Sequence, residues 1–215
     1  MLRRGALIVF EGCDRVGKST HTKLLSDALK EDDIKVETLQ FPDRSTVIGG
    51  IINKYLTGSE EIEDHAVHLL FSANRWEAVP KMLQLLNSGV NLIVDRYAYS
   101  GVAFSYAKKG LSFSWCKQSD VGLPKPDLVL YLDLPSEAMA KRSGFGEERY
   151  EKGDFQNEVK KVYGLLREDN WKVISTDREL SEVQEEIKTL VKQTINNSAR
   201  STYDTLWTDN FETYV

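Results

Sequence analysis

The sequence predicts an α/β fold in which helices cover both faces of a parallel sheet. Short, continuous apolar runs indicate strands buried on both faces, because a strand with one exposed face would alternate apolar and polar residues. Segments with helical spacing separate these runs, and strands that alternate with helices build right-handed βαβ units. At 215 residues, the chain is long enough for one such domain with a full core.

We expect each apolar run to form a strand, and we expect all of these strands to be buried. They span residues 6–10 (ALIVF), 35–40 (KVETLQ), 90–95 (VNLIVD), 127–133 (DLVLYLD) and 171–176 (WKVIST). Helical spacing fills the intervals between the strands. The expected helices run from His21 onward and over 46–57, 63–88 with an interruption at Pro80, 97–109, 135–142, 154–169 and 180–195.

Two segments fall outside this alternation. Residues 143–154 (SGFGEERYEKGD) are rich in glycine and charge and lie between two helices, which suits a lid over a ligand. The single domain is expected to occupy residues 1–196. Residues 197–215 then form a C-terminal tail for which the sequence gives no chemical role, and disorder is the expectation there.

The first expected strand leads into a phosphate-binding loop. Gly12, four further residues, Gly17, Lys18 and Ser19 spell G-x-x-x-x-G-K-[ST] between a strand and a helix, as the motif requires. The glycines let backbone N–H groups turn inward around an anion, and the helix start adds a positive dipole end. Lys18 can neutralise the β- and γ-phosphates of a nucleoside triphosphate, and the Ser19 hydroxyl can bind Mg²⁺. A chance glycine turn before a helix would not explain the whole pattern.

The composition is that of an ordinary soluble globular protein, with 41% hydrophobic and 28% charged residues. A net charge of -5 argues against a nucleic-acid binder, whose surface is usually basic. No apolar run approaches the length of a membrane span, and the run near the N-terminus is too short for a signal peptide and ends in Glu11. Cys13 and Cys116 form neither a disulfide framework nor a metal-ligand spacing. The expected compartment is the cytoplasm or the nucleus.

Charged residues follow the expected strands, at the sheet edge where open parallel sheets bind ligands. Asp95 ends a buried strand, and its carboxylate can hold waters of Mg²⁺, cap the next helix, or do both. Arg44 and Arg96 each follow a strand and carry a planar fork that matches phosphate oxygens. One such arginine would more often be a surface ion pair. Two at one sheet edge favour a phosphorylated acceptor over a plain alcohol.

One expected helix carries an aromatic residue beside an arginine. Phe71 and Arg75 lie four residues apart and therefore share a face, where the ring could stack on a base and the guanidinium could bond to its edge. A core phenylalanine with a solvated arginine is the usual explanation for such a pair. His65 and His68 share this helix without a third ligand, so no metal site is expected there.

Other classes of phosphate-loop protein fit the sequence less well. A GTPase would carry Asn-Lys-x-Asp to read guanine, and residues 53–56 (NKYL) lack the acid. An ATPase or motor would normally be longer and would have a module that couples it to a partner. Phosphoryl transfer to a small molecule remains.

Several stretches together closely resemble thymidylate kinases of the eukaryotic type. They are ALIVFEGCDRVGKST from Ala6, FPDR at 41–44, HLLFSANRWE at 68–77, VDRYAYSGVAFS at 94–105, GLPKPDLVLYLD at 122–133 and ERYE at 148–151. The resemblance implies a P-loop NTPase fold of the nucleoside-monophosphate-kinase type, with a five-stranded parallel sheet, helices on both faces and a lid. It also implies phosphate transfer from Mg-ATP to dTMP, giving dTDP, in a homodimer.

The resemblance carries roles over by position. The catalytic residues would be Lys18, Arg15, Arg96 and Asp95, with Ser19 and Asp95 serving magnesium. Residues expected to bind ATP are Gly12, Asp14, Arg15, Val16, Gly17, Lys18, Ser19, Thr20 and, over the adenine, Arg142. Residues expected to bind dTMP are Asp14, Phe41, Arg44, Phe71, Arg75, Arg96, Ser100, Gly101, Phe104 and Tyr150.

Within the dTMP set, the resemblance implies specific contacts. Arg44 and Arg96 clamp the phosphate, Phe71 stacks on thymine, and Arg75 hydrogen-bonds its edge. Tyr150 lies near the 2′ position of the sugar and would disfavour ribonucleotides.

At the tip of the phosphate loop, Asp14 resembles the acid that accepts a hydrogen bond from the 3′-hydroxyl, and Arg15 the arginine that bridges donor and acceptor phosphates. Relatives with a neutral residue at the Arg15 position place a catalytic arginine in the lid. This lid retains Arg149, so the share of each arginine stays open.

The implied mechanism is positioning with charge neutralisation. The dTMP phosphate has a second pKa of about 6 and is therefore largely anionic at neutral pH, so no general base is needed. A deoxynucleoside kinase is the nearest alternative, but it would phosphorylate thymidine and leave Arg44 without a partner. A nucleotide-binding regulatory module without turnover is the other alternative, although all the expected catalytic residues are present.

Overall fold

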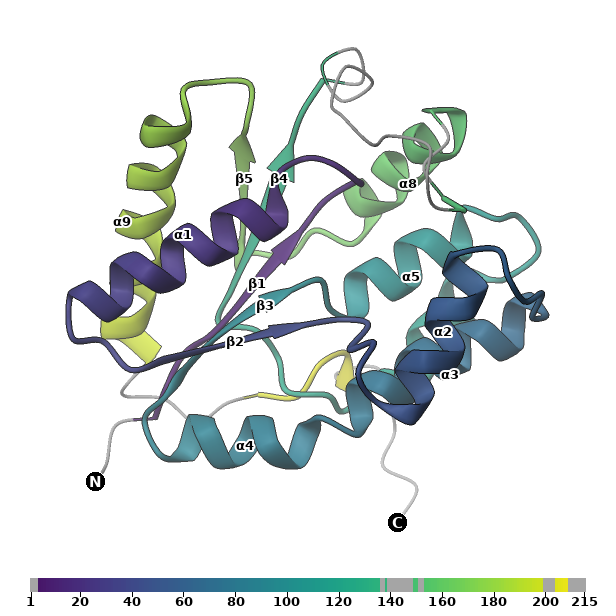
Figure 1. The fold of residues 1–215 in the computed structure, drawn as a ribbon, viewed down its shortest axis with the longest axis horizontal. Coiled ribbons are helices and arrows are strands. Elements are labelled where there is room, and N and C mark those ends of the chain that lie inside the picture. The colour runs from purple at the N-terminus through teal and green to yellow at the C-terminus, as the bar shows by residue number, and fades with distance from the viewer. Residues whose placement is uncertain (1–3, 136–137, 139–148, 151–152, 199–203, 209–215) are drawn as a thin grey trace.

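Five parallel strands form one sheet, in the order β2-β3-β1-β4-β5, in the computed structural model (Figure 1). The structure describes residues 4–135, 138, 149–150, 153–198 and 204–208. The strands are β1 (Leu7–Glu11), β2 (Val36–Gln40), β3 (Asn91–Asp95), β4 (Leu128–Asp133) and β5 (Trp171–Ser175). The predicted parallel sheet and the number of its strands are confirmed.

Helices cover both faces of this sheet. On one face, α1 (Lys18–Glu31) and α9 (Leu180–Ser198) lie side by side (Figure 1). The opposite face carries α4 (Val79–Asn87), α5 (Ala98–Tyr106) and α8 (Gly153–Leu165). Helices α3 (Asp64–Trp76) and the short α6 (Phe113–Gln118) pack against α5, and α2 (Val47–Leu56) packs against α3. No helix within the described ranges is long and apolar enough to cross a membrane.

The central strands are buried as their apolar runs predict. Every residue of β1 and of β3 is buried, and β1 pairs with β3 on one side and β4 on the other. The prediction that residues 35–40 form a buried strand is wrong in one respect. β2 is an edge strand that pairs with β3 alone, and Glu37, Thr38 and Gln40 are exposed.

The helices differ most from the predictions in two places, apart from shifts of a few residues at other helix ends. The stretch 63–88 is two helices, since α3 ends at Trp76 and Pro80 lies in the first turn of α4, where its missing N–H costs no hydrogen bond. The sequence analysis missed α6, whose N-cap is Ser112; its hydroxyl accepts a hydrogen bond from the Trp115 N–H at 3.2 Å. Most of the expected helix 135–142 and of the expected lid 143–154 lies outside the described residues.

Part of the C-terminal tail packs on the domain. Helix α9 continues past the predicted boundary at 196 to Ser198, and residues 204–208 lie against the turn that precedes β4. Leu206 is fully buried; its N–H donates to the Leu123 carbonyl at 2.7 Å, and its carbonyl accepts from the Gly122 N–H at 2.9 Å. The expectation of disorder therefore fails for residues 204–208, and the other tail residues beyond Ser198 lie outside the described part of the chain.

Candidate active site

The carboxyl ends of β1 and β3 bring the phosphate loop next to Asp95 and Arg96. Because Phe10 and Asp95 are paired across the two strands, the residues that follow each strand emerge side by side. The Ser19 hydroxyl at the start of α1 donates to Asp95 Oδ2 at 2.6 Å. The other carboxylate oxygen, Asp95 Oδ1, is buried and has no hydrogen-bond partner among the described residues. A hydroxyl beside a carboxylate with a spare buried oxygen is an all-oxygen set of the kind that suits Mg²⁺.

Lys18 closes over the phosphate loop. Its ammonium donates to the carbonyl oxygens of Gly12 at 3.2 Å and Cys13 at 2.5 Å. Burial, helped by the nearby positive charge of Arg96, lowers the pKa of Lys18 to about 8. A bound polyphosphate would favour the charged ammonium, because its negative charge offsets the lost hydration. Gly12 has a φ of 141°, and a side chain there would come within 2.5 Å of the Leu132 carbonyl oxygen, so this turn requires glycine.

Glu11, the last residue of β1, caps helix α5 from a different element. Its Oε1 accepts hydrogen bonds from the Tyr97 N–H at 2.9 Å and the Ser100 N–H at 3.0 Å, whereas Tyr97, the N-cap residue, provides no side-chain cap. Its Oε2 accepts from the hydroxyls of Ser100 and, at 2.9 Å, Tyr163. Burial raises the pKa of this carboxyl, while the hydrogen bonds and Arg96 counteract part of that effect. One carboxylate thus satisfies the backbone N–H groups that open α5.

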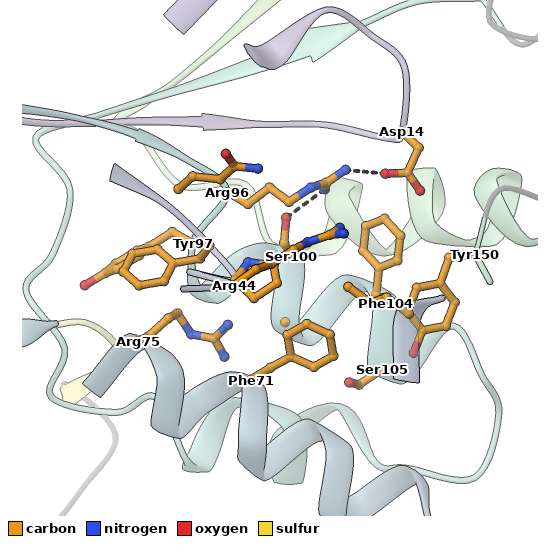
Figure 2. A pocket seen from close by; sticks show the side chains of 15 residues that line it. Asp14, Arg44, Phe71, Arg75, Arg96, Tyr97, Ser100, Phe104, Ser105 and Tyr150 are labelled. Atoms are coloured by element: carbon orange, nitrogen blue, oxygen red, sulfur yellow. Dashed lines mark hydrogen bonds and ion pairs between the residues drawn. The ribbon is translucent and has the colours of Figure 1, made fainter. Parts of the chain in front are cut away.

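Arg96 lies between this capped helix and the phosphate loop. Its backbone φ is 66°, a left-handed conformation that costs energy for any residue other than glycine. The guanidinium pairs with Asp14 and donates to the Ser100 hydroxyl at 3.1 Å (Figure 2). It also donates to the Gly12 carbonyl at 3.1 Å. Its carbon lies 5.1 Å from the centre of the Phe104 ring. Arg96 is therefore held from several directions at the boundary of the loop and the adjoining pocket.

Asp14 is fixed by Gln156, in the first turns of α8. The Gln156 side-chain amide donates to Asp14 Oδ2 at 2.6 Å and to the Tyr150 carbonyl at 2.9 Å, and its oxygen accepts the Asp14 N–H at 2.9 Å. Gln156 is buried. A single amide thus joins the acid of the phosphate loop to the segment that ends the expected lid.

A pocket opens beside Arg96, and the predicted dTMP-binding residues line it. Figure 2 shows Arg44, Arg75 and Arg96 extending toward this cavity from different elements, with Phe71, Phe104 and Tyr150 around it. All ten residues predicted to bind dTMP are among its lining residues: Asp14, Phe41, Arg44, Phe71, Arg75, Arg96, Ser100, Gly101, Phe104 and Tyr150. The structure thus brings together residues that lie up to 136 positions apart, as the difference between Asp14 and Tyr150 gives.

Arg75 is not the solvated arginine of the alternative explanation. It is 2% exposed and forms an ion pair with Asp120, which is fully buried. A Cβ at Gly101 would lie 2.6 Å from Arg75 Nη2, so the absence of a side chain there leaves room for the guanidinium at the pocket wall. Arg44, by contrast, is near the surface and donates to Asn53 Oδ1 at 2.9 Å.

Asn74 anchors the loop that carries Arg44. Its side-chain oxygen accepts the Asp43 N–H at 2.7 Å, and its amide nitrogen lies 3.2 Å from the Asp43 carbonyl and 2.7 Å from a Glu77 carboxylate oxygen. Asn74 is fully buried, so the loop after β2 is tied to α3 at the pocket rim.

Two described residues of the expected lid, Arg149 and Tyr150, pack against α2 and α8. The Arg149 guanidinium donates to Glu61 at 2.6 Å and to the Tyr55 carbonyl at 3.0 Å, and it lies over the Tyr55 ring. The Tyr150 ring stacks on Phe155 with centroids 5.3 Å apart. Arg149 therefore points to α2 here, whereas Arg15 is part of the phosphate loop. Arg142 lies outside the described residues.

Three buried polar residues of this site were missed by the sequence analysis: Glu11, Asp120 and Gln156. Glu11 carried a usable signal, because it ends a buried strand just as Asp95 does. Asp120 and Gln156 lie within helical or turn segments with no local pattern that distinguishes them from solvated polar residues. Their partners are 45 and 142 positions away in the chain.

Comparison with known proteins gives one consistent answer. A family model described as thymidylate kinase matches residues 10–187. The chain is 50% identical to the thymidylate kinase of Homo sapiens over 208 residues, which cover 95% of this chain and 98% of that protein. It is 46% identical to the thymidylate kinase of Schizosaccharomyces pombe over 209 residues, with 94% and 98% covered.

A solved structure agrees in fold. The thymidylate kinase of Candida albicans superposes with a TM-score of 0.86 at 36% identity, covering 96% of this chain and 100% of that one.

Proposed function

Because this chain belongs to the thymidylate kinase family and phosphorylates dTMP with ATP, giving dTDP for the supply of dTTP, we propose how its residues share that reaction. The observation that supports the division is the position of Arg96 and Asp14. Both line the nucleotide pocket, and both contact the phosphate loop or belong to it. The two substrates would therefore meet at these side chains.

The phosphate loop would bind ATP. Its backbone N–H groups and the start of α1 would hold the phosphates, and Lys18 would leave the Gly12 and Cys13 carbonyls to neutralise them. Asp14, Arg15, Val16, Gly17 and Thr20 would complete the ATP site. The role of Arg142 over the adenine stays a proposal from the sequence. Ser19 and Asp95 would hold Mg²⁺, whose spare buried ligand would be Asp95 Oδ1. When bound, Mg²⁺ supplies positive charge that neutralises the β- and γ-phosphates.

The pocket would bind dTMP. Arg44 and Arg96 would bind its phosphate by their planar forks. At the base end, Phe71 would stack on thymine, and Arg75 would donate to its edge. Asp14 would accept the 3′-hydroxyl, and Tyr150 would crowd the 2′ position against ribonucleotides. Phe41, Ser100, Gly101 and Phe104 would line the remaining wall.

Catalysis in this arrangement consists of positioning and charge neutralisation. The acceptor phosphate is already anionic at neutral pH, so no residue needs to remove a proton. Lys18, Arg15 and Arg96 would offset the repulsion between the donor and acceptor phosphates as they approach. Arg15 would be the best placed of the three to neutralise the charge that develops on the transferred phosphoryl group. Exclusion of water from the site would strengthen each of these contacts.

The acceptor preference tests the proposal directly. We expect faster ADP release with dTMP than with thymidine, because Arg44 and Arg96 would bind a phosphate that thymidine lacks. UMP should be poor because of Tyr150, and chelation of Mg²⁺ should abolish turnover with restoration on adding it back. The measurement is a coupled ADP-release assay at matched acceptor concentrations. Faster turnover of thymidine than of dTMP would refute the acceptor assignment.

Asp14 and Arg15 should fail in different ways when they are changed. Asp14→Asn should weaken use of dTMP, but the loss should shrink with 3′-deoxy-dTMP, because the hydroxyl that the acid binds is already missing. Arg15→Gly should lower kcat with little change in the dTMP KM, since its charge acts chiefly in the transition state. Lysine in place of Arg15 should rescue only part of the loss. If instead the two residues serve only as loop-tip charges, both variants will show similar small losses with every acceptor.

We further propose a homodimer in which α2 and α3 pair with a second copy. Exposed apolar side chains gather there, with Val47 86% and Leu69 49% exposed. Leu69→Asp should yield a monomer of 24.5 kDa by light scattering, half the mass expected for the unchanged protein. The matched control is Leu180→Asp on α9, an equally exposed leucine at 50%, which should stay dimeric. An unchanged protein that scatters as a monomer at micromolar concentration would contradict the proposal.

The cytoplasm or nucleus is the compartment that we propose for this reaction. Both cysteines, Cys13 and Cys116, are free and buried, as a reducing compartment allows. A fluorescent fusion of the full chain that enters the secretory route would contradict this.

A further inference from the structure

Beneath the base end of the pocket, Asp120 holds Arg75 through two hydrogen bonds. Arg75 Nε donates to Asp120 Oδ1 at 3.0 Å, and Nη2 donates to Oδ2 at 2.6 Å. The carboxylate is fully buried and the guanidinium nearly so. A paired, bidentate geometry in a dry environment fixes both the position and the plane of the guanidinium.

The Asp120 carboxylate is itself held in place. The Ser72 hydroxyl lies 2.8 Å from Asp120 Oδ1 and 2.8 Å from the Ser119 carbonyl. The Trp76 indole N–H donates to the same Ser119 carbonyl at 2.7 Å. Just beyond Asp120, the backbones of Gly122 and Leu123 form hydrogen bonds with Leu206 of the C-terminal segment. The turn that carries Asp120 is therefore held on both sides. This acid is therefore a fixed support for Arg75 and has no evident contact with the cavity of its own.

With Nε and Nη2 engaged, the Arg75 edge that remains for a ligand presents hydrogen-bond donors only. A guanidinium has no acceptor, and Asp120 prevents it from turning away. Such an edge attracts a carbonyl oxygen and repels an amino group. The charge of Asp120 also balances that of Arg75, so a neutral base can be seated without leaving an unpaired buried cation.

We propose that Asp120 is a positioning residue that sets base selectivity: it locks Arg75 as a fixed donor, so that the pocket accepts a pyrimidine with a carbonyl at that edge and rejects one with an amino group. This inference rests on the proposed function, in which Arg75 faces the base. Thymine and uracil carry a carbonyl at position 4, where cytosine carries an amino group. The methyl group that separates thymine from uracil plays no part in this contact.

Three acceptors separate this role from a general loss of structure. In Asp120→Asn, the KM for dTMP and for dUMP should rise in parallel, by about tenfold or more, because a hydrogen bond to a charged partner is lost and Arg75 is no longer held. The KM for dCMP should change by less than about threefold, since its amino group makes no favourable hydrogen bond with Arg75 in the unchanged protein. The measurement is steady-state kcat and KM for the three acceptors at saturating ATP. Equal loss with all three, or no loss with any, would overturn the proposal.

Asp127→Asn is the matched control. Asp127 also forms a bidentate pair with an arginine, Arg4, at 2.8 and 2.6 Å, and it accepts the Leu7 N–H at 2.8 Å, but it precedes β4 at the opposite end of the sheet. This variant should lose stability without changing the ratio of dTMP to dCMP specificity. A change in that ratio equal to the one in Asp120→Asn would overturn the proposal.

Ser72→Ala decides the question if Asp120→Asn does not fold. It removes one hydrogen bond from Asp120 and leaves both charges, so the KM for dTMP and dUMP should rise by about two- to fivefold with dCMP unchanged. If the KM values for dTMP, dUMP and dCMP change equally or not at all in this variant, that result would count against Asp120 as the residue that holds Arg75. Failure of the proposed function looks different, because the unchanged protein would then show no preference for dTMP over dCMP.

Discussion

The carboxylate of Glu11 is the interaction on which the site depends. It ends β1, the strand that leads into the phosphate loop, and it accepts the N–H groups of Tyr97 and Ser100 that open α5. An element that would bind one substrate is thereby tied to the element that would bind the other. Because the contact is buried and charged, it is strong and cannot be exchanged for water at little cost. Arg96 lies beside this junction in a left-handed conformation. The junction thereby holds Arg96 at the boundary between the phosphate loop and the pocket.

The same principle recurs for two arginines of the pocket, Arg75, which is buried, and Arg96, which is half-buried. Arg96 is balanced by Asp14, and Arg75 is balanced by Asp120. Each acid fixes the direction in which its arginine can donate, and each is fixed in turn by a neutral side chain, Gln156 for Asp14 and Ser72 for Asp120. Without these carboxylates, the positive charges of the three arginines would repel one another across the pocket. The paired carboxylates leave a concentration of donors without an excess of unbalanced buried charge.

Local sequence patterns predicted which residues of the phosphate loop and the strand ends would come together, but not the residues that hold them in place. Lys18, Ser19 and Asp95 were predictable because a local motif or a strand end marks each of them. Glu11 also ends a buried strand, but that position does not reveal its partners in α5 and α8, and Asp120 and Gln156 have no local signal. The partners of these three residues lie 45 to 152 positions away, a distance that no local pattern encodes. The edge position of β2 was missed for a related reason, since the order of strands in a sheet is set by the path of the connections. The contact of Leu206 with Gly122 and Leu123 is likewise a long-range pairing.

The central claim, that Glu11 joins the two substrate sites, is tested most directly by the kinetics of Glu11→Gln. The amide keeps the size of the side chain and one accepting oxygen, but it removes the charge that strengthens the cap of α5 and that faces Arg96. The account predicts that the KM for dTMP rises by about tenfold while the KM for ATP changes by less than about threefold, because the phosphate loop retains its own backbone geometry. An unchanged KM for dTMP, or equal increases for both substrates, would contradict the claim.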